Sequence, residues 1–296
     1  YLKYKRRQFD YLLVGQILPL GTIALFFAQF YRVKYAVFLH GLDFNLAVKN
    51  RWKKWLTKNI LLKADRIISA NSYTAGLVND FYPLAAKKSL VLNPGIDPNI
   101  ITTLKLADFR HQYWLEDKIV LLSLGRLVKR KGVDMTIKAI QSLEKGLREK
   151  IVYVVAGQGS EINYLKDLAQ GDKQIIFLGE IDETAKWSWL ASCDIFIMPA
   201  RNILGDFEGF GIVYLEANLL GKPVIAGRSG GVPDAVENNQ NGLLVDPEDV
   251  TAIAQAITAL ANDPALREKL GQQGKQRALK DFSWKKQAEV LFTSLD

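Results

Sequence analysis

Short apolar runs alternate with amphipathic segments along this chain of 296 residues, and the alternation predicts an α/β fold with parallel sheets. The apolar runs are rich in Val, Ile and Leu, which is typical of strands buried on both faces of a sheet. A first series of strands is expected at Tyr11–Val14, Tyr35–Leu39, Arg66–Ala70 and Ser89–Leu92. A second series is expected at Ile119–Leu124, Ile151–Ala156, Ile175–Leu178, Ile195–Met198, Pro223–Ala226 and Gly242–Val245.

Helical segments fall between these strands, so each series is expected to form a doubly wound, Rossmann-like domain. The clearest helices are expected at Thr22–Tyr31, Met135–Leu143, Tyr164–Gln170, Phe210–Leu220 and Val250–Ala261. Asn93-Pro94-Gly95 opens a turn-rich linker, which predicts an N-terminal domain over residues 1–100 and a C-terminal domain over residues 101–284. Because a complete Rossmann-type domain usually has about six strands and the first series has fewer, the N-terminal domain is expected to be incomplete.

Tyr11 to Tyr31 form an uncharged stretch of 21 residues, which is long enough to span a bilayer as one helix. Gln16, Pro19 and Gly21 interrupt this stretch. They favour a strand, a turn over Gly15–Gly21 and a buried helix instead of a transmembrane helix.

The composition excludes several classes of protein. Apolar residues make up 49% of the chain and charged residues 24%, which excludes disordered, collagen-like and coiled-coil proteins. The single cysteine, Cys193, excludes a disulfide scaffold and a cysteine-rich zinc site, and it is expected in the core. His40 and His111 are the two histidines and leave little for a histidine-based metal centre. With a reducing compartment indicated and no secretory signal pattern, we expect a cytoplasmic protein.

Positive charge is concentrated at the front of the chain. Residues 1–100 contain 15 Lys and Arg against 5 Asp and Glu, whereas residues 101–296 contain 24 against 26. The front half is therefore expected to face an anionic partner.

A basic stretch between Lys49 and Lys63 alternates cations with Trp52, Trp55 and other apolar residues. This pattern suits the anionic headgroups of a membrane surface, and it predicts peripheral attachment to the inner face of the membrane. The alternative is an ordinary helix whose apolar stripe packs inward and whose lysines are solvated. A nucleic-acid partner is not expected, because no nucleic-acid-binding motif accompanies the charge.

The strongest chemical motif runs from Glu208 to Glu216 and contains Gly209 and Gly211. Glu208 is expected just before a helix and Glu216 two turns inside it, which would set the carboxylates about 10–12 Å apart along the helix axis. The glycines let a ligand approach the backbone, and free N–H groups at the start of the helix suit a diphosphate. A nucleotide sugar, with hydroxyls at both ends and a diphosphate between them, fits this arrangement.

A second motif runs from Gly125 to Gly132, directly after a predicted strand. It lies at the carboxyl edge, where open α/β sheets bind their ligands. Arg126 can form forked hydrogen bonds to phosphate oxygens, and Lys131 can supply a point charge. The alternative is a basic surface loop without a ligand.

Other segments also follow predicted strands. Gly157-Gln158-Gly159 lacks the third glycine of a dinucleotide fingerprint, because Ile162 occupies that position, and this argues against NAD. Residues 229–233 form a glycine-rich turn, and His40 follows the strand Tyr35–Leu39; both are candidates for ligand contact. No Ser-His-Asp triad and no Asp-x-Asp pair are recognised, so we expect cationic side chains to hold a diphosphate without a metal.

Taken together, these segments resemble a retaining glycosyltransferase of the GT-B fold, in glycosyltransferase family 4, also called glycosyl transferases group 1. The resemblance extends from about residue 9 to residue 292 and is most specific over residues 119–249. Glu208 and Glu216 match the E-x7-E motif of the family. The family's Gly-Arg and Lys-Gly loop is matched by Gly125, Arg126, Lys131 and Gly132.

Further segments extend the resemblance. Residues 199–209 match the family's Pro-to-Glu-Gly segment, and residues 230–234 nearly match its Gly-Gly-x-Pro-Glu turn, with Asp234 in the last place. His40 matches the family's active-site histidine, and residues 93–97 match a Pro-Asn-Gly-Val-Asp turn with Pro and Asn exchanged. Arg201 is similar to an arginine of mannosyltransferases that act on phosphatidylinositol.

The resemblance implies a division of roles among these residues. Arg126 and Lys131 would hold the donor diphosphate, assisted by backbone N–H groups of Phe210 and Gly211. Glu208 would bond hydroxyls of the donor sugar and stabilise the developing oxocarbenium.

The nucleoside and the far side of the sugar have their own candidates. By the same resemblance, Glu216 would bond the ribose hydroxyls and the base would lie near Glu180 and Ile181. His40 would contact the sugar from the N-terminal domain, and residues 229–230 are weaker candidates.

The implied activity is the transfer of a hexose, with retention, from a nucleoside diphosphate sugar to a glycan or lipid-linked acceptor in polysaccharide or glycolipid synthesis. A UDP-hexose such as UDP-glucose comes first as donor and GDP-mannose second. In the implied front-face course the leaving diphosphate takes the acceptor proton, so no metal or cofactor is expected. The alternatives are a sugar-nucleotide 2-epimerase or phosphorylase of the same fold, and a non-catalytic basic binding module.

The chain differs from the family at its front. The family's first strand and its glycine-rich loop have no counterpart before Tyr1, and by length roughly 80–90 residues are expected to be absent. The family's last helix crosses back to the first domain. Phe282-Ser283-Trp284 resembles that crossing, so residues 285–296 are expected to join the N-terminal domain.

Overall fold

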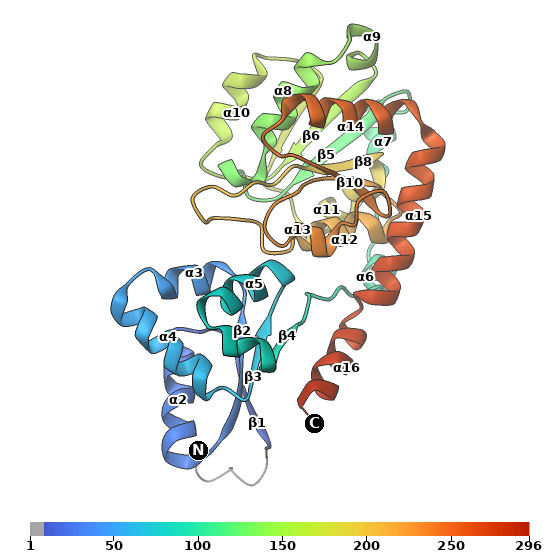
Figure 1. Cartoon of the computed structure of the whole chain (residues 1–296). Coiled ribbons are helices and arrows are strands. Elements are labelled where there is room, and N and C mark those ends of the chain that lie inside the picture. The colour runs from blue at the N-terminus through green and yellow to red at the C-terminus, as the bar shows by residue number, and fades with distance from the viewer. Residues whose placement is uncertain (1–8, 296) are drawn as a thin grey trace. The chain divides into compact units, whose positions relative to one another are not determined.

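The computed structural model describes residues 9–295, which divide into two compact units (Figure 1). Among the described residues, unit 1 comprises 9–94 and 287–295, and unit 2 comprises 95–286. Part of the predicted N-terminal charge, from Lys3, Lys5, Arg6 and Arg7, lies outside the described residues, as does Asp296.

The boundary between the units lies at Pro94, whereas the sequence predicts it at residue 100. The linker joins unit 2 because Ile96 pairs with the segment before the last helix: its N–H donates to the carbonyl of Phe282 at 2.7 Å, and its carbonyl accepts from Trp284 at 3.3 Å. Gly95 packs so closely that an added Cβ would lie 2.8 Å from the ring of Trp284. The last helix, α16 (Trp284–Leu295), ends in unit 1, where the carbonyl of Ser294 accepts a hydrogen bond from Arg66.

Unit 1 is a parallel four-stranded sheet with strand order β1-β2-β3-β4. Its strands are β1 (Tyr11–Val14), β2 (Lys34–Leu39), β3 (Arg66–Ser69) and β4 (Ser89–Val91). Its helices before the linker are α2 (Leu20–Tyr31), α3 (Leu42–Val48), α4 (Arg51–Lys63) and α5 (Ser72–Phe81), followed by a 3-10 segment at Pro83–Lys88. The core is built on Tyr35, Val37, Leu39, Ile60 and Ile67, which are fully buried.

The uncharged stretch from Tyr11 to Tyr31 forms β1 and α2, as the sequence predicts, and not one long helix. Gly21 lets α2 approach α4, since a Cβ there would lie 3.1 Å from the side chain of Ile60. Within residues 9–295, no helix combines the length and the apolar character needed to cross a membrane.

Unit 2 is a parallel six-stranded sheet with strand order β10-β9-β8-β5-β6-β7. Its strands are β5 (Ile119–Leu124), β6 (Ile151–Ala156), β7 (Ile175–Gly179), β8 (Ile195–Met198), β9 (Val224–Gly227) and β10 (Gly242–Val245). This is the order of a Rossmann domain, in which the first and fourth strands are neighbours and the chain winds outward from them in both directions. The predicted strands of both units are present, with ends that agree within one residue.

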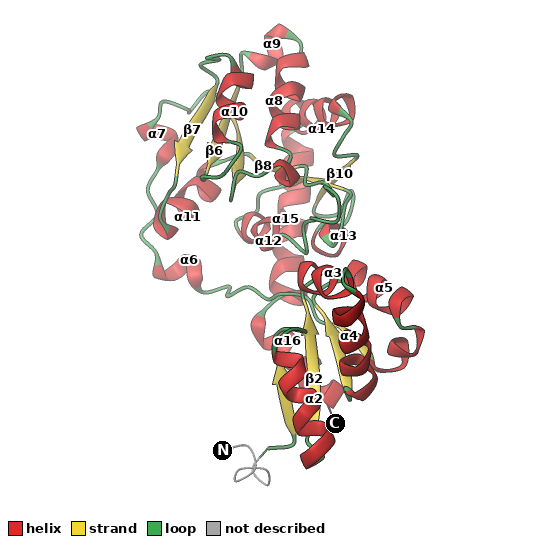
Figure 2. Ribbon diagram, turned by 90° about the vertical axis from the view of Figure 1, so that its left-hand side faces the viewer, coloured by secondary structure: helices red, strands yellow, loops and turns green. Residues whose placement is uncertain are grey.

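Helices cover both faces of the unit 2 sheet (Figure 2). The helices of unit 2 are α6 (Ile100–Thr103), α7 (Phe109–Gln112), α8 (Val133–Ser142), α9 (Lys145–Arg148), α10 (Ile162–Ala169), α11 (Glu183–Ser192), α12 (Ile212–Leu219), α13 (Val232–Ala235), α14 (Val250–Asn262) and α15 (Pro264–Asp281). Alternate strand residues point to opposite faces. Val120 and Leu122 therefore pack in one buried cluster with α11, α12 and α15, while Leu121 and Tyr153 pack in another with α8, α10 and α14.

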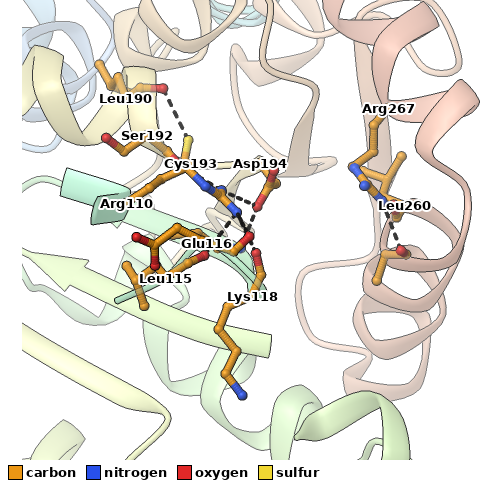
Figure 3. A network of polar contacts seen from close by, with 12 residues as sticks. Arg110, Leu115, Glu116, Lys118, Leu190, Ser192, Cys193, Asp194, Leu260 and Arg267 are labelled. Atoms are coloured by element: carbon orange, nitrogen blue, oxygen red, sulfur yellow. Dashed lines mark hydrogen bonds and ion pairs between the residues drawn. The ribbon is translucent and has the colours of Figure 1, made fainter. Parts of the chain in front are cut away.

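Arg110 ties the loop before β5 to the start of β8 (Figure 3). Its guanidinium pairs with Asp194 at 2.9 Å and donates to several backbone carbonyls, including that of Lys118 at 2.8 Å. The same carboxylate of Asp194 accepts from the backbone of Val120 at 2.7 Å. Cys193 beside it is fully buried, as predicted, and burial raises the pKa of its thiol to about 12. The thiol is therefore a neutral core group.

Candidate active site

The strand order of unit 2 places the predicted site residues at one edge of its sheet. β5 and β8 are neighbours, and their following connections leave toward opposite sides. Ligands of open α/β sheets bind outside the carboxyl ends of the strands at such a switch point. The Gly125–Gly132 loop follows β5, and the segment that carries Glu208 follows β8. Two motifs that are about 80 residues apart therefore meet at a known type of ligand site.

Backbone contacts lock the loops at this edge together. A Cβ on Gly132 would overlap the carbonyl oxygen of Pro199, at the end of β8, and Gly132 has a φ of +73°. A Cβ on Gly157, after β6, would overlap the carbonyl oxygen of Gly125, and its φ is +135°. Only glycine meets both the conformation and the close approach at these two positions. The edge is thus a packed surface of backbone groups.

Glu208 lies beside cations of the β5 loop. Its Oε2 lies 2.6 Å from Lys131 Nζ and 3.9 Å from Arg130 Nη2. Arg130 Nε also lies 3.2 Å from a carboxylate oxygen of Asp206. The side chains of Glu208, Lys131 and Arg130 are 11%, 13% and 14% exposed, so these charges interact in a partly desolvated place where Coulomb forces are stronger than in water.

The glycine-rich turn after β9 holds the backbone of Glu208. The N–H of Gly231 donates to the Glu208 carbonyl at 3.0 Å, and a Cβ on Gly230 would lie 2.5 Å from the same oxygen. Of the weaker candidates at residues 229–230, Gly230 is therefore brought to the backbone of Glu208, and Ser229 instead donates to the carbonyl of Gly227 at 2.8 Å.

Helix α12 begins later than the sequence predicts. Gly211, with a φ of +78°, is its N-cap, so the helix starts at Ile212 instead of Phe210. A Cβ on Gly211 would overlap the ring of Tyr214, which explains why the chain uses glycine there. Because residues 209–211 are not helical, the predicted 10–12 Å axial separation of Glu208 and Glu216 does not apply.

Glu216 lies within α12 and pairs with a lysine that the sequence reasoning missed. Lys186 Nζ, from α11, lies 2.9 Å from Glu216 Oε1 and 2.7 Å from Glu183 Oε1. The signal that could have found Lys186 is its place on the helix that follows the predicted base contacts Glu180 and Ile181.

A pocket of about 310 Å³ joins several predicted donor contacts. Arg126, Glu180, Ile181 and Lys186 line it together with the glycine-containing ends of β5 and β6. Arg126 is exposed, and its guanidinium is available to a ligand. The base candidates and one diphosphate candidate thus share one cavity within unit 2.

His40 lies in unit 1, at the carboxyl end of β2. Its backbone N–H donates to Asp43 at 2.9 Å, and its Nε2 lies 3.1 Å from the carbonyl oxygen of Gly15, the residue after β1. In the tautomer that carries the proton on Nε2, that bond would hold the ring and leave Nδ1 as an acceptor. Its role toward a donor sugar stays a prediction.

Arg201 has a structural environment. It is 5% exposed, and its Nη2 lies 2.9 Å from each carboxylate oxygen of Asp134 in α8, which is 7% exposed. Its Nε donates to the carbonyl of Lys129 at 3.1 Å, and its backbone N–H donates to that of Arg130 at 2.8 Å. Arg201 therefore binds the backbone of the β5 loop at Lys129 and Arg130 and links it to α8.

The arrangement can bind an anion that carries hydroxyl groups. Arg126, Arg130 and Lys131 supply positive charge at the carboxyl edge, and the acids Glu208 and Glu216 can accept hydrogen bonds from hydroxyls. Within residues 9–295, no group of three or more His, Cys, Asp or Glu side chains is placed to hold a metal ion. These side chains are therefore suited to a ligand that carries both phosphate and hydroxyl groups.

Sequence comparison identifies the class to which this fold and site belong. Residues 106–277 match the sequence profile of glycosyl transferases group 1, and residues 1–100 match that of glycosyltransferase family 4. The chain is a member of the glycosyl transferases group 1 family, as its motifs predict.

Individual members of the family with named activities are also similar to this chain. The chain is 35% identical over 230 residues to a GDP-mannose-dependent alpha-(1-6)-phosphatidylinositol monomannoside mannosyltransferase of Mycolicibacterium smegmatis, covering 75% of this chain and 59% of the relative. It is 32% identical over 167 residues to a glycogen synthase of Mycobacterium tuberculosis, covering 55% of this chain and 39% of that enzyme. The chain thus spans less than two thirds of the length of these relatives.

Solved structures share the fold. A glycosyltransferase of Rickettsia africae aligns with a TM-score of 0.81 at 19% identity, covering 98% of this chain and 77% of that one. Anabaena HepE, solved in complex with UDP, aligns with a TM-score of 0.79 at 20% identity, covering 99% and 80%. These similarities establish the GT-B fold.

Proposed function

We propose that this protein transfers a hexose from a nucleoside diphosphate sugar to an acceptor hydroxyl. The observation that carries the proposal is the contact between Glu208 and Lys131 at the carboxyl edge of the unit 2 sheet, next to the pocket that contains Arg126. The cations suit the diphosphate, which is both the binding handle and the leaving group, and the acid suits the sugar hydroxyls. Binding and chemistry would use the same few side chains.

The proposed reaction retains the configuration at the sugar carbon. The bond from that carbon to the diphosphate oxygen breaks, the bond to the acceptor oxygen forms on the same face, and the leaving diphosphate takes the acceptor proton. Arg126 and Lys131 stabilise the charge on the leaving group, and Glu208 stabilises the developing oxocarbenium. In this course the protein supplies cations and no dedicated base or metal.

The relatives change the order of the candidate donors. The family resemblance alone places a UDP-hexose first and GDP-mannose second, because UDP-hexoses are widespread donors in the family, whereas the mannosyltransferase relatives are named as GDP-mannose-dependent. We therefore propose GDP-mannose first and a UDP-hexose second. The acceptor would be a lipid-linked or glycan hydroxyl, by analogy with the phosphatidylinositol mannoside and glycogen named for these relatives.

A thermal-shift screen of the full-length protein with GDP, UDP and ADP tests the donor class. A ligand that binds the native state alone raises the melting temperature, by an amount that corresponds to about 2.7 kcal/mol at a hundred times its Kd. GDP or UDP is expected to raise it and ADP to have little effect. A melting temperature unchanged by all of them would contradict the proposal.

Incubation of the full-length protein with donor alone separates the related activities. A transferase needs an acceptor for rapid turnover. Conversion of the donor sugar to its 2-epimer without an acceptor would identify an epimerase instead. Turnover that depends on inorganic phosphate would identify a phosphorylase.

We also propose that unit 1 binds an anionic membrane surface through α4. The apolar residues of α4 have two different environments. Ile60 and Leu61 are buried, as expected for an ordinary amphipathic helix, whereas Trp52 and Trp55 are 66% and 56% exposed. Their rings stack at 5.1 Å, next to exposed lysines of the same helix. Exposed indoles beside cations suit the interface between headgroups and acyl chains.

Replacing Trp52 and Trp55 together with alanine is expected to weaken binding to vesicles that contain phosphatidylglycerol by about tenfold or more, because two indoles lose their apolar contact. Trp114, which is 84% exposed in unit 2, supplies the matched control Trp114→Ala. Cosedimentation with phosphatidylcholine vesicles, with and without phosphatidylglycerol, measures the effect. Equal binding of the double variant and the wild type would show that Trp52 and Trp55 do not bind the membrane. Binding to RNA and not to the vesicles would favour a nucleic-acid-binding module.

A further inference from the structure

Lys186 connects two acids at the nucleoside end of the candidate site. Its Nζ lies 2.9 Å from Glu216 Oε1 and 2.7 Å from Glu183 Oε1. The side chains of Lys186 and Glu216 are 16% and 14% exposed, whereas that of Glu183 is 60% exposed. The ion pair between Lys186 and Glu216 is therefore partly desolvated, and the more exposed Glu183 holds the Lys186 ammonium from the solvent side.

Trp187 holds both Glu183 and Lys186 in place. Glu183 Oε1 also accepts a hydrogen bond from the indole N–H of Trp187 at 2.8 Å, and the Lys186 ammonium lies 4.8 Å from the centre of that ring. Trp187 is 3% exposed and belongs to the unit 2 core. The position of Lys186 is thus set by a buried side chain of its own helix.

Lys186 stays charged in this environment. Burial lowers the pKa of its ammonium, but the hydrogen bond to Glu183 and the charge of Glu216 outweigh burial and raise the pKa above its usual value. The hydrogen bond from Lys186 also holds the pKa of Glu183 below its usual range. The three groups therefore form a network of one cation and two carboxylates.

The network leaves one oxygen of Glu216 for a ligand. Lys186 occupies Oε1, and among residues 9–295 no protein group forms a hydrogen bond to Oε2. Lys186 also lines the 310 Å³ pocket beside Glu180 and Ile181, so it links the cavity to the acid. A carboxylate with one oxygen fixed by a lysine has a defined direction for its second oxygen.

We propose that Lys186 is a positioning residue for ribose recognition: it holds Glu216 Oε1 so that Oε2 accepts from a ribose hydroxyl, and it thereby selects ribonucleotide donors over deoxyribonucleotides. This inference rests on the proposed function, since it takes the ligand to be a nucleoside diphosphate. Lys186 also offsets the charge of Glu216, which would otherwise repel the diphosphate of the same ligand. Loss of Lys186 would remove both the fixed orientation of Glu216 Oε2 and the neutralisation of the Glu216 charge.

The test compares the Kd of the full-length protein for GDP and UDP with that for their 2′-deoxy and 3′-deoxy forms, by isothermal titration calorimetry. The wild type is expected to bind the better ribonucleotide about tenfold or more tightly than at least one deoxy form, since a hydrogen bond to a charged group is lost. Lys186→Met is expected to reduce this ratio to nearly one, as is Glu216→Gln. The matched control is Lys166→Met, an exposed lysine of α10, which keeps the wild-type ratio.

Further variants separate positioning from folding. Lys186→Arg keeps a cation and is expected to restore most of the discrimination. Glu183→Gln loosens the outer support at an exposed position and is expected to reduce the ratio by a smaller factor. The double variant Lys186→Met with Glu216→Gln is expected to discriminate no worse than either single variant, because both act on one interaction.

The outcomes distinguish the two proposals. A wild type that binds no nucleotide overturns both of them. A wild type that discriminates, with Lys186→Met weakening ribonucleotide and deoxyribonucleotide equally, overturns the positioning role alone. Additive losses in the double variant also overturn it.

Discussion

Replacing Lys131 with methionine is expected to lower the kcat/KM of the full-length protein by about 10²- to 10³-fold, the range found when one preorganised donor to a developing negative charge is removed. Lys131 lies 2.6 Å from Glu208 in a place where both side chains are little exposed. In the proposed reaction its removal takes a cation from the leaving diphosphate, and it leaves Glu208 with the more distant Arg130 as a neighbouring cation. The loss should appear in kcat, because the interaction strengthens as the bond to the leaving group breaks.

Glu208→Gln tests the other half of the pair. Glu208→Gln is expected to lower kcat/KM by a similar factor. The double variant is expected to lower kcat/KM by less than the product of the two single factors, because the residues act as one unit. Lys129→Met, at an exposed position two residues before Lys131, is the control and should retain activity. Unchanged sugar-nucleotide turnover in the variant Glu208→Ala with Lys131→Ala would contradict the proposed function.

Asp134→Asn is expected to destabilise unit 2 by about 3–5 kcal/mol, because it leaves the buried charge of Arg201 without its counterion. Arg201 and Asp134 are 5% and 7% exposed, so water does not compensate for the lost charge. For a unit of this size the melting temperature is expected to fall by about 10 °C, since each kcal/mol shifts it by about 2–4 °C. Thermal unfolding followed by circular dichroism measures the change.

Two comparison variants define the cause of that loss. Asp167→Asn, on an exposed face of α10, is expected to leave the melting temperature unchanged. Replacing Asp134 with leucine and Arg201 with methionine together is expected to recover part of the loss, because no unpaired charge remains. An Asp134→Asn protein as stable as the wild type would show that the pair is not required for the fold.

The α/β pattern was readable from the sequence because buried parallel strands such as Ile151–Ala156 consist of unbroken apolar residues. The boundary at Pro94 was not, since it depends on the pairing of Ile96 with Phe282, which are far apart in the chain. The start of α12 also differs, because Gly211 serves as its cap and not as part of the helix.

The site was predictable in its residue types and less so in its partners. Glu208 and Lys131 belong to recognisable motifs, but their direct contact follows from the neighbouring positions of β5 and β8. Lys186 carries no motif, and its contact with Glu216 joins two helices. Arg201 resembles a residue of lipid-directed mannosyltransferases, yet its burial against Asp134 depends on the three-dimensional packing.

The glycine contacts at the carboxyl edge have a consequence for how this protein tolerates sequence variation. Gly125 and Gly157, Gly132 and Pro199, and Gly230 and Glu208 meet through backbone atoms, so the frame of the site does not depend on the side chains that line the pocket. If the proposed base contacts are correct, saturation libraries directed at residues 180 and 181, which line the pocket, are expected to vary donor preference while this frame is retained. Libraries that include residues 132, 157 or 230 are expected to lose most members to misfolding, so the part of the proposed donor site that tolerates substitution is correspondingly small.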